Sequence, residues 1–323
     1  MRKSLFVAAW TALFAVPASA VTIVWVPIGN PGNPGDAPVP TKCYVPDCGS
    51  VAYDYRISRY ETTNAQYAEF LNAVDVEGNN TLELYNASMD TDPTFGGISR
   101  VPGNAPGSRY VVKPGFEDQP VTYVSFYDAL RFANWMSNGQ GSGDTETGAY
   151  TLLGGTANPS NGLTVARNAG ANVFLTSENE WYKAAYYSPG GVYFDYPTGT
   201  DAVTVCVAPD ADTGNSANCA SGALTTAGAY GLSESPYGTF DQGGNLWEWT
   251  EQIVSGTFAA PRGGNWEDGA GYLAASSSGY DGVNSERDDY GFRVASLVPE
   301  PAQALLVLTG GLVMAAARRQ RRA

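Results

Sequence analysis

The chain contains no histidine and only four cysteines among its 323 residues. These two residue types supply most ligands of zinc sites, so a histidine-based metal centre is excluded. The sequence also has no nucleophile elbow, no phosphate loop with its lysine and no zinc motif. Several large classes of hydrolase, nucleotide-binding protein and zinc enzyme are therefore ruled out.

Basic residues are scarce as well. Of the 18 lysines and arginines, Arg2 and Lys3 stand at the start, and four arginines stand between residues 318 and 322. Residues 4–317 therefore carry 12 basic side chains (18 minus 6) against 32 acidic ones, a net charge of −20. Such a surface repels nucleic acid, which we do not expect as a partner, and suits solvation or divalent cations.

The first apolar run, from Leu5 to Val16, is too short to cross a bilayer comfortably. It follows two basic residues and leads into Ala-Ser-Ala at residues 18–20, which is the arrangement of a cleaved signal peptide. We assign residues 1–20 to a signal peptide and expect the protein to be exported.

A second apolar segment, from Ala302 to Ala317, follows the sequence VPEP and precedes the arginine cluster. Residues 298–323 thus resemble the PEP-CTERM sorting signal of Gram-negative bacteria that make exopolysaccharide. The resemblance implies an exosortase-type partner that removes the tail after its transient insertion in the membrane. The protein would then stay in the cell envelope or extracellular matrix. A permanent anchor is the alternative, although this segment reaches only about 24 Å as a helix.

The four cysteines, Cys43, Cys48, Cys206 and Cys219, are an even number in a chain expected to be exported, so disulfides are the default. Three pairings are possible. We favour the local one, Cys43 with Cys48 and Cys206 with Cys219, because it joins the cysteines nearest in sequence.

Residues 21–297 contain no internal repeat and no long linker, so we expect one domain with its core between residues 51 and 296. Capping-box patterns followed by apolar residues at helical spacing predict three helices, which begin after Thr63, Ser125 and Ser177. Short β-like runs lie at Val21–Val26, Gly263–Trp266 and Gly291–Ala295. These features predict a loop-rich α+β fold.

The stretch from Gly238 to Glu251 reads GTFDQGGNLWEWTE. On a strand, Trp247 and Trp249 would share one face and Glu248 would point to the other. A carboxylate beside glycine carbonyls is an arrangement that can bind calcium. The alternative is a structural turn that leads into a tryptophan-rich core strand.

This stretch resembles a motif of the formylglycine-generating enzyme, or sulfatase-modifying factor, family. Five further segments resemble family motifs in the same order: RISRYETTNAQYAEFLNAV from Arg56, PVTYVSFYDALRFANW from Pro120, FLTSENEWYKAAYY from Phe174, PRGGNW from Pro261 and GFRVA from Gly291. The resemblance implies a variant of the C-type lectin-like fold. It is an irregular, loop-rich α+β fold with about three short helices and short antiparallel strands.

In this family, the resemblance implies two copper-binding cysteines between the PRGGNW-like and GFR-like segments. The matching segment here, Gly263 to Arg293, has no cysteine, and Cys219 lies before the Gly238 stretch. A copper(I) site needs thiolates, so we expect neither copper nor the oxidase mechanism. A related branch holds iron through histidines, which this chain lacks.

Family members bind calcium through the WEW loop, and the resemblance places the matching ligands at Asp241, Gly244, Leu246 and Glu248. The family usually has Asn at the first of these positions. Asn218 resembles the entry to a second calcium site, although no acidic loop follows it. We therefore name calcium as the expected cofactor and leave the second site open.

Two functions from different classes follow. The first is a non-catalytic, exported binding or structural module of the cell envelope or exopolysaccharide matrix, with a polysaccharide or matrix protein as ligand and no catalytic residue. The alternative is an enzyme of the same superfamily with a diverged activity. The acid pairs Glu178 with Glu180 and Asp288 with Asp289 resemble glycosidase carboxylates in composition, but we expect solvated surface acids.

Overall fold

The computed structural model describes residues 20–38 and 42–298. The predicted sorting signal and nearly all of the predicted signal peptide lie outside these residues. Among the helices that the structure describes, none is both long enough and apolar enough to cross a membrane.

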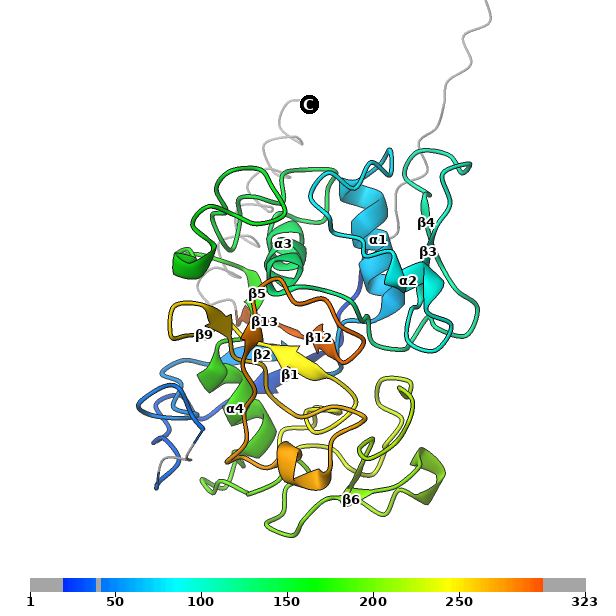
Figure 1. Cartoon of the computed structure of the whole chain (residues 1–323). Helices are drawn as coiled ribbons and strands as arrows, with labels where there is room; N and C mark the ends of the chain where they lie inside the picture. Colours follow the sequence, from blue (N-terminus) through cyan, green and yellow to red (C-terminus); the bar gives the residue numbers. More distant parts are fainter. Residues whose placement is uncertain (1–19, 39–41, 299–323) are drawn as a thin grey trace, which may run out of the picture.

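The centre of the fold is a four-stranded antiparallel sheet in the order β1-β2-β13-β5 (Figure 1). Its strands are β1 (Trp25–Ile28), β2 (Tyr55–Ser58), β5 (Val173–Leu175) and β13 (Val294–Leu297). Because β13 lies between β2 and β5, the last strand of the domain joins its beginning to its middle. Strands from the beginning, the middle and the end of the described chain therefore share one sheet.

Three predicted helices are present, and each begins as its capping box predicts. They are α1 (Asn64–Val74), α3 (Phe126–Ser137) and α4 (Glu178–Tyr186). In each, the N-cap side chain accepts from the third residue of the helix, and that residue's side chain accepts from the N-cap backbone. A fourth helix, α2 (Ser88–Thr91), is a single turn without a side-chain cap, and the sequence analysis missed it.

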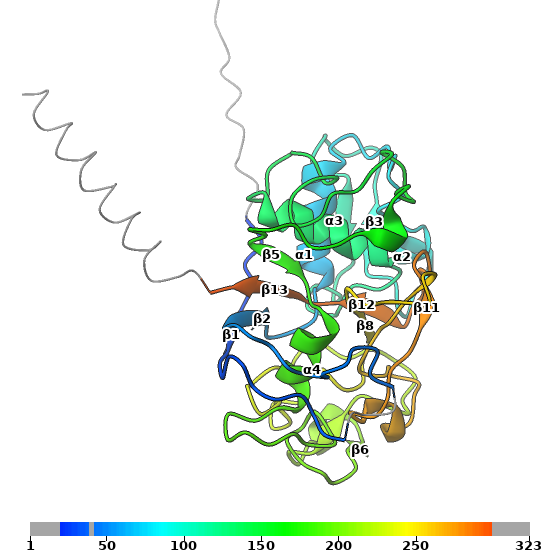
Figure 2. The same ribbon diagram turned by 90° about the vertical axis from the view of Figure 1, so that its left-hand side faces the viewer.

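The helices lie on both sides of the central sheet: α1 and α3 on one side, α4 on the other (Figures 1 and 2). Aromatic rings fill the space around α1 and α3, where Phe132 packs edge-on against both Phe70 and Phe292. All three rings are buried. Aromatic pairs of this geometry add to the stability that burial provides.

The remaining strands form four small sheets of two or three strands each within the described chain. Their bounds are β3 (Ile98–Arg100), β4 (Tyr110–Val112), β6 (Val205–Cys206), β7 (Ser216–Ala217), β8 (Trp247–Trp249), β9 (Ile253–Val254), β10 (Phe258–Ala259), β11 (Asp281–Gly282) and β12 (Tyr290–Phe292). Three 3₁₀ turns, η1 (Gly162–Thr164), η2 (Pro209–Ala211) and η3 (Ala270–Leu273), complete the described chain. The predicted α+β class and loop-rich character are confirmed.

Several local predictions were wrong. The pairs β8–β12 and β6–β7 are parallel rather than antiparallel. Residues 263–266 form no strand, since Gly263 and Gly264 both have positive φ. The run Gly291–Ala295 is divided between β12 and β13 at Arg293, whose side chain enters the buried site described below.

Candidate functional site

The WEW segment forms the short strand β8, which is buried on both faces. It pairs in parallel with β12, so Glu248 lies opposite Gly291. A Cβ at position 291 would come within 2.6 Å of the Leu246 side chain. Glycine thus permits this close approach, and Arg293, two residues further along the chain, reaches Glu248.

The Glu248 carboxylate accepts three hydrogen bonds, two from Arg293 and one from Trp181. Nε and Nη2 of Arg293 donate to its two carboxylate oxygens, each at 2.6 Å. The indole Nε1 of Trp181, in α4, donates to the same carboxylate at 2.6 Å. Both charged side chains have 0 % exposure. A desolvated pair with two hydrogen bonds and a third donor is a strong contact, and it joins α4, β8 and the residue between β12 and β13.

Two further carboxylates share this environment. Glu61 is buried and accepts from the Asn245 amide at 3.1 Å, while Asp241, which is partly buried, accepts from the backbone N–H of Gly228 at 2.5 Å. Burial raises the pKa of Asp241 to about 6. Burial and the nearby charges of Asp241 and Glu248 raise the pKa of Glu61 well above its ordinary value. Within the described residues, neither acid forms an ion pair.

The structure brings four of the predicted calcium ligands and Asn218 to this region. Gly244 has a φ of +82°, and a Cβ there would lie 2.3 Å from the Asn218 carbonyl oxygen. The Asn218 side chain donates to Asn245 at 2.9 Å and accepts from Ser221 at 2.6 Å. Asn245 in turn donates to Glu61. Asn218, Asn245 and Glu61 therefore form one hydrogen-bonded chain, while Glu248 is held separately by Arg293.

Glu61 and Arg293 are site residues that the sequence analysis did not single out. Arg293 was noted only as part of the GFRVA motif. Its position between buried apolar residues of an acidic chain is the signal that could have identified it, because a buried arginine requires a carboxylate partner. Glu61 carries no comparable signal, since an acid just before a helix cap is ordinarily exposed.

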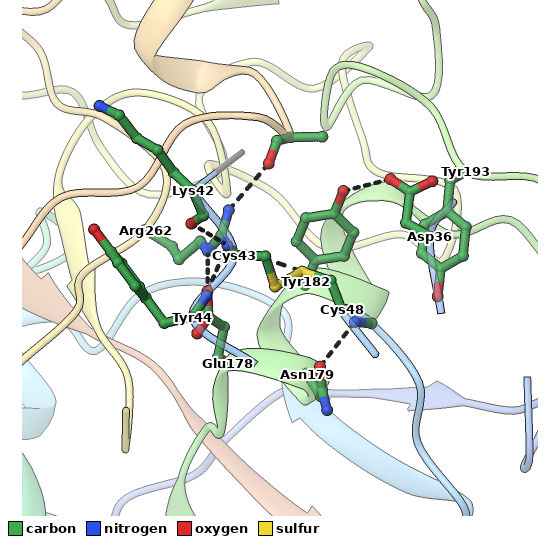
Figure 3. The surroundings of a disulfide bond; sticks show 12 residues. Asp36, Lys42, Cys43, Tyr44, Cys48, Glu178, Asn179, Tyr182, Tyr193 and Arg262 are labelled. Atoms are coloured by element: carbon green, nitrogen blue, oxygen red, sulfur yellow. Dashed lines mark hydrogen bonds and ion pairs between the residues drawn. A yellow bond between two sulfur atoms is a disulfide. The ribbon is translucent and has the colours of Figure 1, made fainter. Parts of the chain in front are cut away.

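The first disulfide, Cys43–Cys48, covers a second buried ion pair (Figure 3). Nη2 of Arg262 lies 2.5 Å from Oε1 of Glu178, and both side chains have 0 % exposure. Arg262 also donates to the carbonyl of Lys42, beside the disulfide. Within the part of the chain described, the two sulfurs and a Glu178 oxygen form the single cluster of three potential metal-ligand atoms that lie mutually close.

Both disulfides have the favoured local pairing, and the second joins Cys206 to Cys219. It links β6 to the chain just after β7. All four cysteines of the sequence are therefore bonded, and none is free. No thiolate is on hand for a soft metal ion while these bonds are intact.

The prediction that Glu178 and Glu180 are solvated was wrong. Glu180 pairs with Arg167 at 2.7 Å, and Arg167 also contacts Glu251 at 2.8 Å. Although burial acts to raise it, the contacts with Arg167 lower the pKa of Glu180 below its ordinary value. Burial raises the pKa of Glu251 more than Arg167 lowers it. Glu178 and Glu180 lie on the first turn of α4, and the packing of this helix against the sheet buries them.

The Arg167 network borders a cavity of about 260 Å³, which Tyr150, Glu178 and Glu251 also line. The Tyr150 hydroxyl donates to Glu251 at 2.5 Å. Polar groups thus converge here, but the contacts of Arg167, Tyr150 and Glu251 are mainly with one another.

Asp289 of the other predicted acid pair is buried too, and it accepts from Asn265 at 2.8 Å.

The segment from Gly263 to Arg293, which contains no cysteine, is held by buried hydrogen bonds. Nη1 of Arg262 donates to the carbonyls of Ala275 and Ser277 at 3.1 and 2.8 Å. The Tyr186 hydroxyl donates to the carbonyl of Leu273 at 3.0 Å. Leu273 and Ala275 are buried. The backbone of this segment is therefore anchored to α4 and to the Glu178–Arg262 pair.

Comparison with known proteins gives consistent results. The sequence matches the sulfatase-modifying factor enzyme 1-like domain over residues 15–298. None of the curated proteins matches the chain. Among solved structures, CarF is similar at 22 % identity with a TM-score of 0.54, covering 86 % of this chain and 99 % of that one.

Two more solved structures share the fold. Treponema denticola variable protein 1 is 19 % identical with a TM-score of 0.53, over 88 % of this chain and 98 % of its own. PvdO from Pseudomonas aeruginosa is 18 % identical with a TM-score of 0.51, over 88 % and 100 %. At these identities the likeness concerns the fold, whereas the family match spans most of the sequence. The chain belongs to the sulfatase-modifying factor enzyme 1-like domain family.

Proposed function

We propose that this protein is a non-catalytic, exported binding or structural module of the cell envelope or exopolysaccharide matrix. The observation that carries the proposal is the absence of cysteine from residues 263–293, together with the disulfide bonding of all four cysteines elsewhere. The family's copper-dependent oxidation requires thiolates, and oxygen donors such as Asp or Ser do not replace them for copper(I).

The test is an anaerobic copper(I) titration of the purified protein, followed by an oxidase assay on cysteine-containing peptides in air. We expect no tight stoichiometric copper and no loss of peptide thiol beyond that in a protein-free control. Stoichiometric copper with turnover of the peptide would overturn the proposal. A variant with Cys43 and Cys48 both changed to Ser identifies any copper that binds only to reduced cysteines.

Calcium at the Glu248 region is part of the same proposal. Three carboxylates, Glu61, Asp241 and Glu248, share one guanidinium, that of Arg293, which leaves two acids without a basic partner. Two extra buried negative charges require protons or a cation for neutralisation. Calcium accepts carboxylate and backbone oxygens together, and the Gly244–Leu246 loop supplies carbonyls beside the acids. It would add to the network by neutralising Glu61 and Asp241.

Export and C-terminal sorting complete the proposal. Two disulfides support folding in an oxidising compartment, and the tail that follows β13 has the residue pattern of an exosortase substrate. Intact-mass analysis of the protein from an exosortase-containing host should show loss of both the leader and the tail. Retention of residues 302–323 in the mature protein would favour a membrane anchor instead.

One observation favours the alternative of a diverged enzyme, namely the cavity lined by Arg167, Tyr150 and Glu251. Catalytic acids are commonly found where carboxylates and basic groups converge in a cavity. Here Arg167 pairs with both neighbouring acids, which is also how a structural network is built. The binding module therefore remains the function that the site supports better.

A further inference from the structure

A groove of about 600 Å³ runs between the loop at residues 158–164 and the β10–β11 strands. The 3₁₀ turn η1 lies beside the β9–β11 sheet in both views (Figures 1 and 2). The volume of the groove is within the range of small-ligand sites. None of the residues that line the groove is charged, whereas four other cavities of the described chain each have a charged residue in their walls.

The walls combine free amides with one exposed ring. Asn158 and Asn284 are exposed, and no other described residue hydrogen-bonds to either side chain. Each amide offers two donors and an acceptor. Phe258 is 36 % exposed and meets the ring of Tyr280, itself 64 % exposed, edge-on at 5.6 Å. Such walls suit a ligand that has both neutral hydroxyl groups and apolar ring faces.

The groove is held in shape by its floor. Tyr127, on α3, lies beneath Gly162, where an added Cβ would come within 2.1 Å of the tyrosine oxygen. The Asn161 side chain accepts from Leu153 N–H and donates to the Thr151 carbonyl, each at 2.9 Å. A loop fixed by its own hydrogen bonds loses little entropy when a ligand binds.

The charge around the groove favours neutral sugars over carboxylated sugars. Asp281 precedes the lining residue Gly282, accepts from the backbone of Gly282 and from the Ser285 hydroxyl, pairs with Arg287 at 3.9 Å and does not line the groove. A carboxylated sugar would enter the field of a chain with a net charge of −20 over residues 4–317 and would find no arginine or lysine in the groove. A neutral sugar meets no such barrier.

We propose that this groove binds a neutral oligosaccharide without the help of a metal ion. The inference rests on the proposed function as a binding module and names the class of its ligand. Phe258 provides the apolar surface, with Tyr280 packed against its ring outside the lining, and Asn158 and Asn284 bind hydroxyl groups from opposite walls. No carboxylate lines the groove, so binding does not depend on calcium.

The test is isothermal titration of the purified protein with neutral hexasaccharides of glucose, galactose, mannose and N-acetylglucosamine, and with an oligogalacturonate as the acidic comparison. At least one neutral probe should bind, equally well with and without EDTA, and at least tenfold more tightly than the oligogalacturonate. Asn158→Ala, Asn284→Ala and Phe258→Ala should each weaken binding at least tenfold. Asn79→Ala, which removes an exposed amide outside the groove, should change it less than twofold.

Each result has a distinct meaning. Neutral-sugar binding that survives all three groove substitutions would refute the groove while leaving the binding module intact. Absence of binding to every neutral probe, tighter binding of the oligogalacturonate, or loss of binding in EDTA would refute the inference. Copper-dependent peptide oxidation would refute the proposed function separately. Because Asn158 and Asn284 are exposed and make no side-chain hydrogen bonds within the described chain, their variants should keep the wild-type melting temperature.

Discussion

Arg293 shows at the residue scale how one side chain can hold several elements. It donates to both oxygens of Glu248 and also to the carbonyls of Ser58 and Phe240. These partners come from β2, β8 and the loop before β8. A buried arginine with all these contacts satisfied costs little in the folded state, whereas removing one partner leaves a desolvated charge.

We therefore expect Arg293→Met to lower the free energy of unfolding by about 3–5 kcal/mol, because it leaves Glu248 buried without its counter-ion. Urea denaturation measures this change. Arg287→Ala is the matched control, since Arg287 is 57 % exposed in its pair with Asp289, and it should cost less than about 1 kcal/mol. Equal effects of the two substitutions would contradict the assigned role of Arg293. The double variant Arg293→Met, Glu248→Gln should be more stable than Arg293→Met alone.

Asp241 provides a pH test. Its pKa is raised from an ordinary 3.8 to about 6 in the folded protein, so the folded state binds the proton more tightly than the unfolded state. This contribution is fully present below about pH 4 and is lost as the pH rises through about 6. Asp241→Asn should therefore gain about 2 kcal/mol relative to wild type between pH 4 and pH 7. Asn tolerates the φ of 58° found here.

Chemical unfolding at several pH values, without calcium, gives the comparison. Asp118→Asn is the control because Asp118 is exposed, and its difference from wild type should not vary with pH. Added calcium should restore wild-type stability at pH 7 and leave Asp241→Asn nearly unchanged. A wild-type protein that does not respond to calcium at pH 7 would remove calcium from the proposed function.

At the scale of elements, α4 is the helix on which the buried networks depend. It begins at Ser177, and its first turn carries Glu178 and Glu180, which bind Arg262 and Arg167. Trp181, one residue further, reaches Glu248. The first turn of a single helix thus meets three separate arginine–carboxylate groups. The position at which the helix begins decides which side chains enter them.

Ser177→Ala should lower the free energy of unfolding by about 1 kcal/mol, because it removes the side-chain acceptor for the N–H of Glu180. Ser177→Thr should recover most of that loss, as Thr63 performs the same role at α1. Thermal or urea unfolding of the two variants measures the effect. If Thr is as destabilising as Ala, the loss comes from packing rather than from the cap.

At the scale of the whole molecule, the dominant feature is negative charge. The net charge of −20 over residues 4–317 coexists with three fully buried arginines, Arg131, Arg262 and Arg293. Acids are buried beside them, among them Glu178 and Glu248, so the buried charges largely offset one another and most of the net negative charge stays at the surface. Self-repulsion of such a surface opposes the compact state.

The melting temperature should consequently rise with ionic strength. Between 10 and 300 mM NaCl at pH 8, screening should stabilise the protein by about 1 kcal/mol, a shift of a few degrees. Differential scanning calorimetry with chelator present separates this screening from specific calcium binding. A melting temperature that falls with added salt would show that the buried ion pairs, rather than surface repulsion, dominate the response.

The sequence by itself determined the features that depend on neighbouring residues. Capping boxes at Thr63, Ser125 and Ser177 specify where helices begin because the bonds involved span three residues. The local disulfide pairing followed from proximity along the chain, and six ordered motifs identified the family. The lack of cysteine between Gly263 and Arg293, on which the proposed non-catalytic function rests, can likewise be seen in the sequence alone.

Only the tertiary structure decided the environment of each charge. Glu178 and Glu180 have the sequence pattern of exposed acids, but packing of α4 buries them against arginines from distant segments. Glu61 and Arg293 are separated by more than two hundred residues and meet because β13 pairs with β2. The neutral groove is likewise assembled from segments near residues 160, 258 and 284. Burial and long-range pairing depend on the whole chain at once, so no local pattern encodes them.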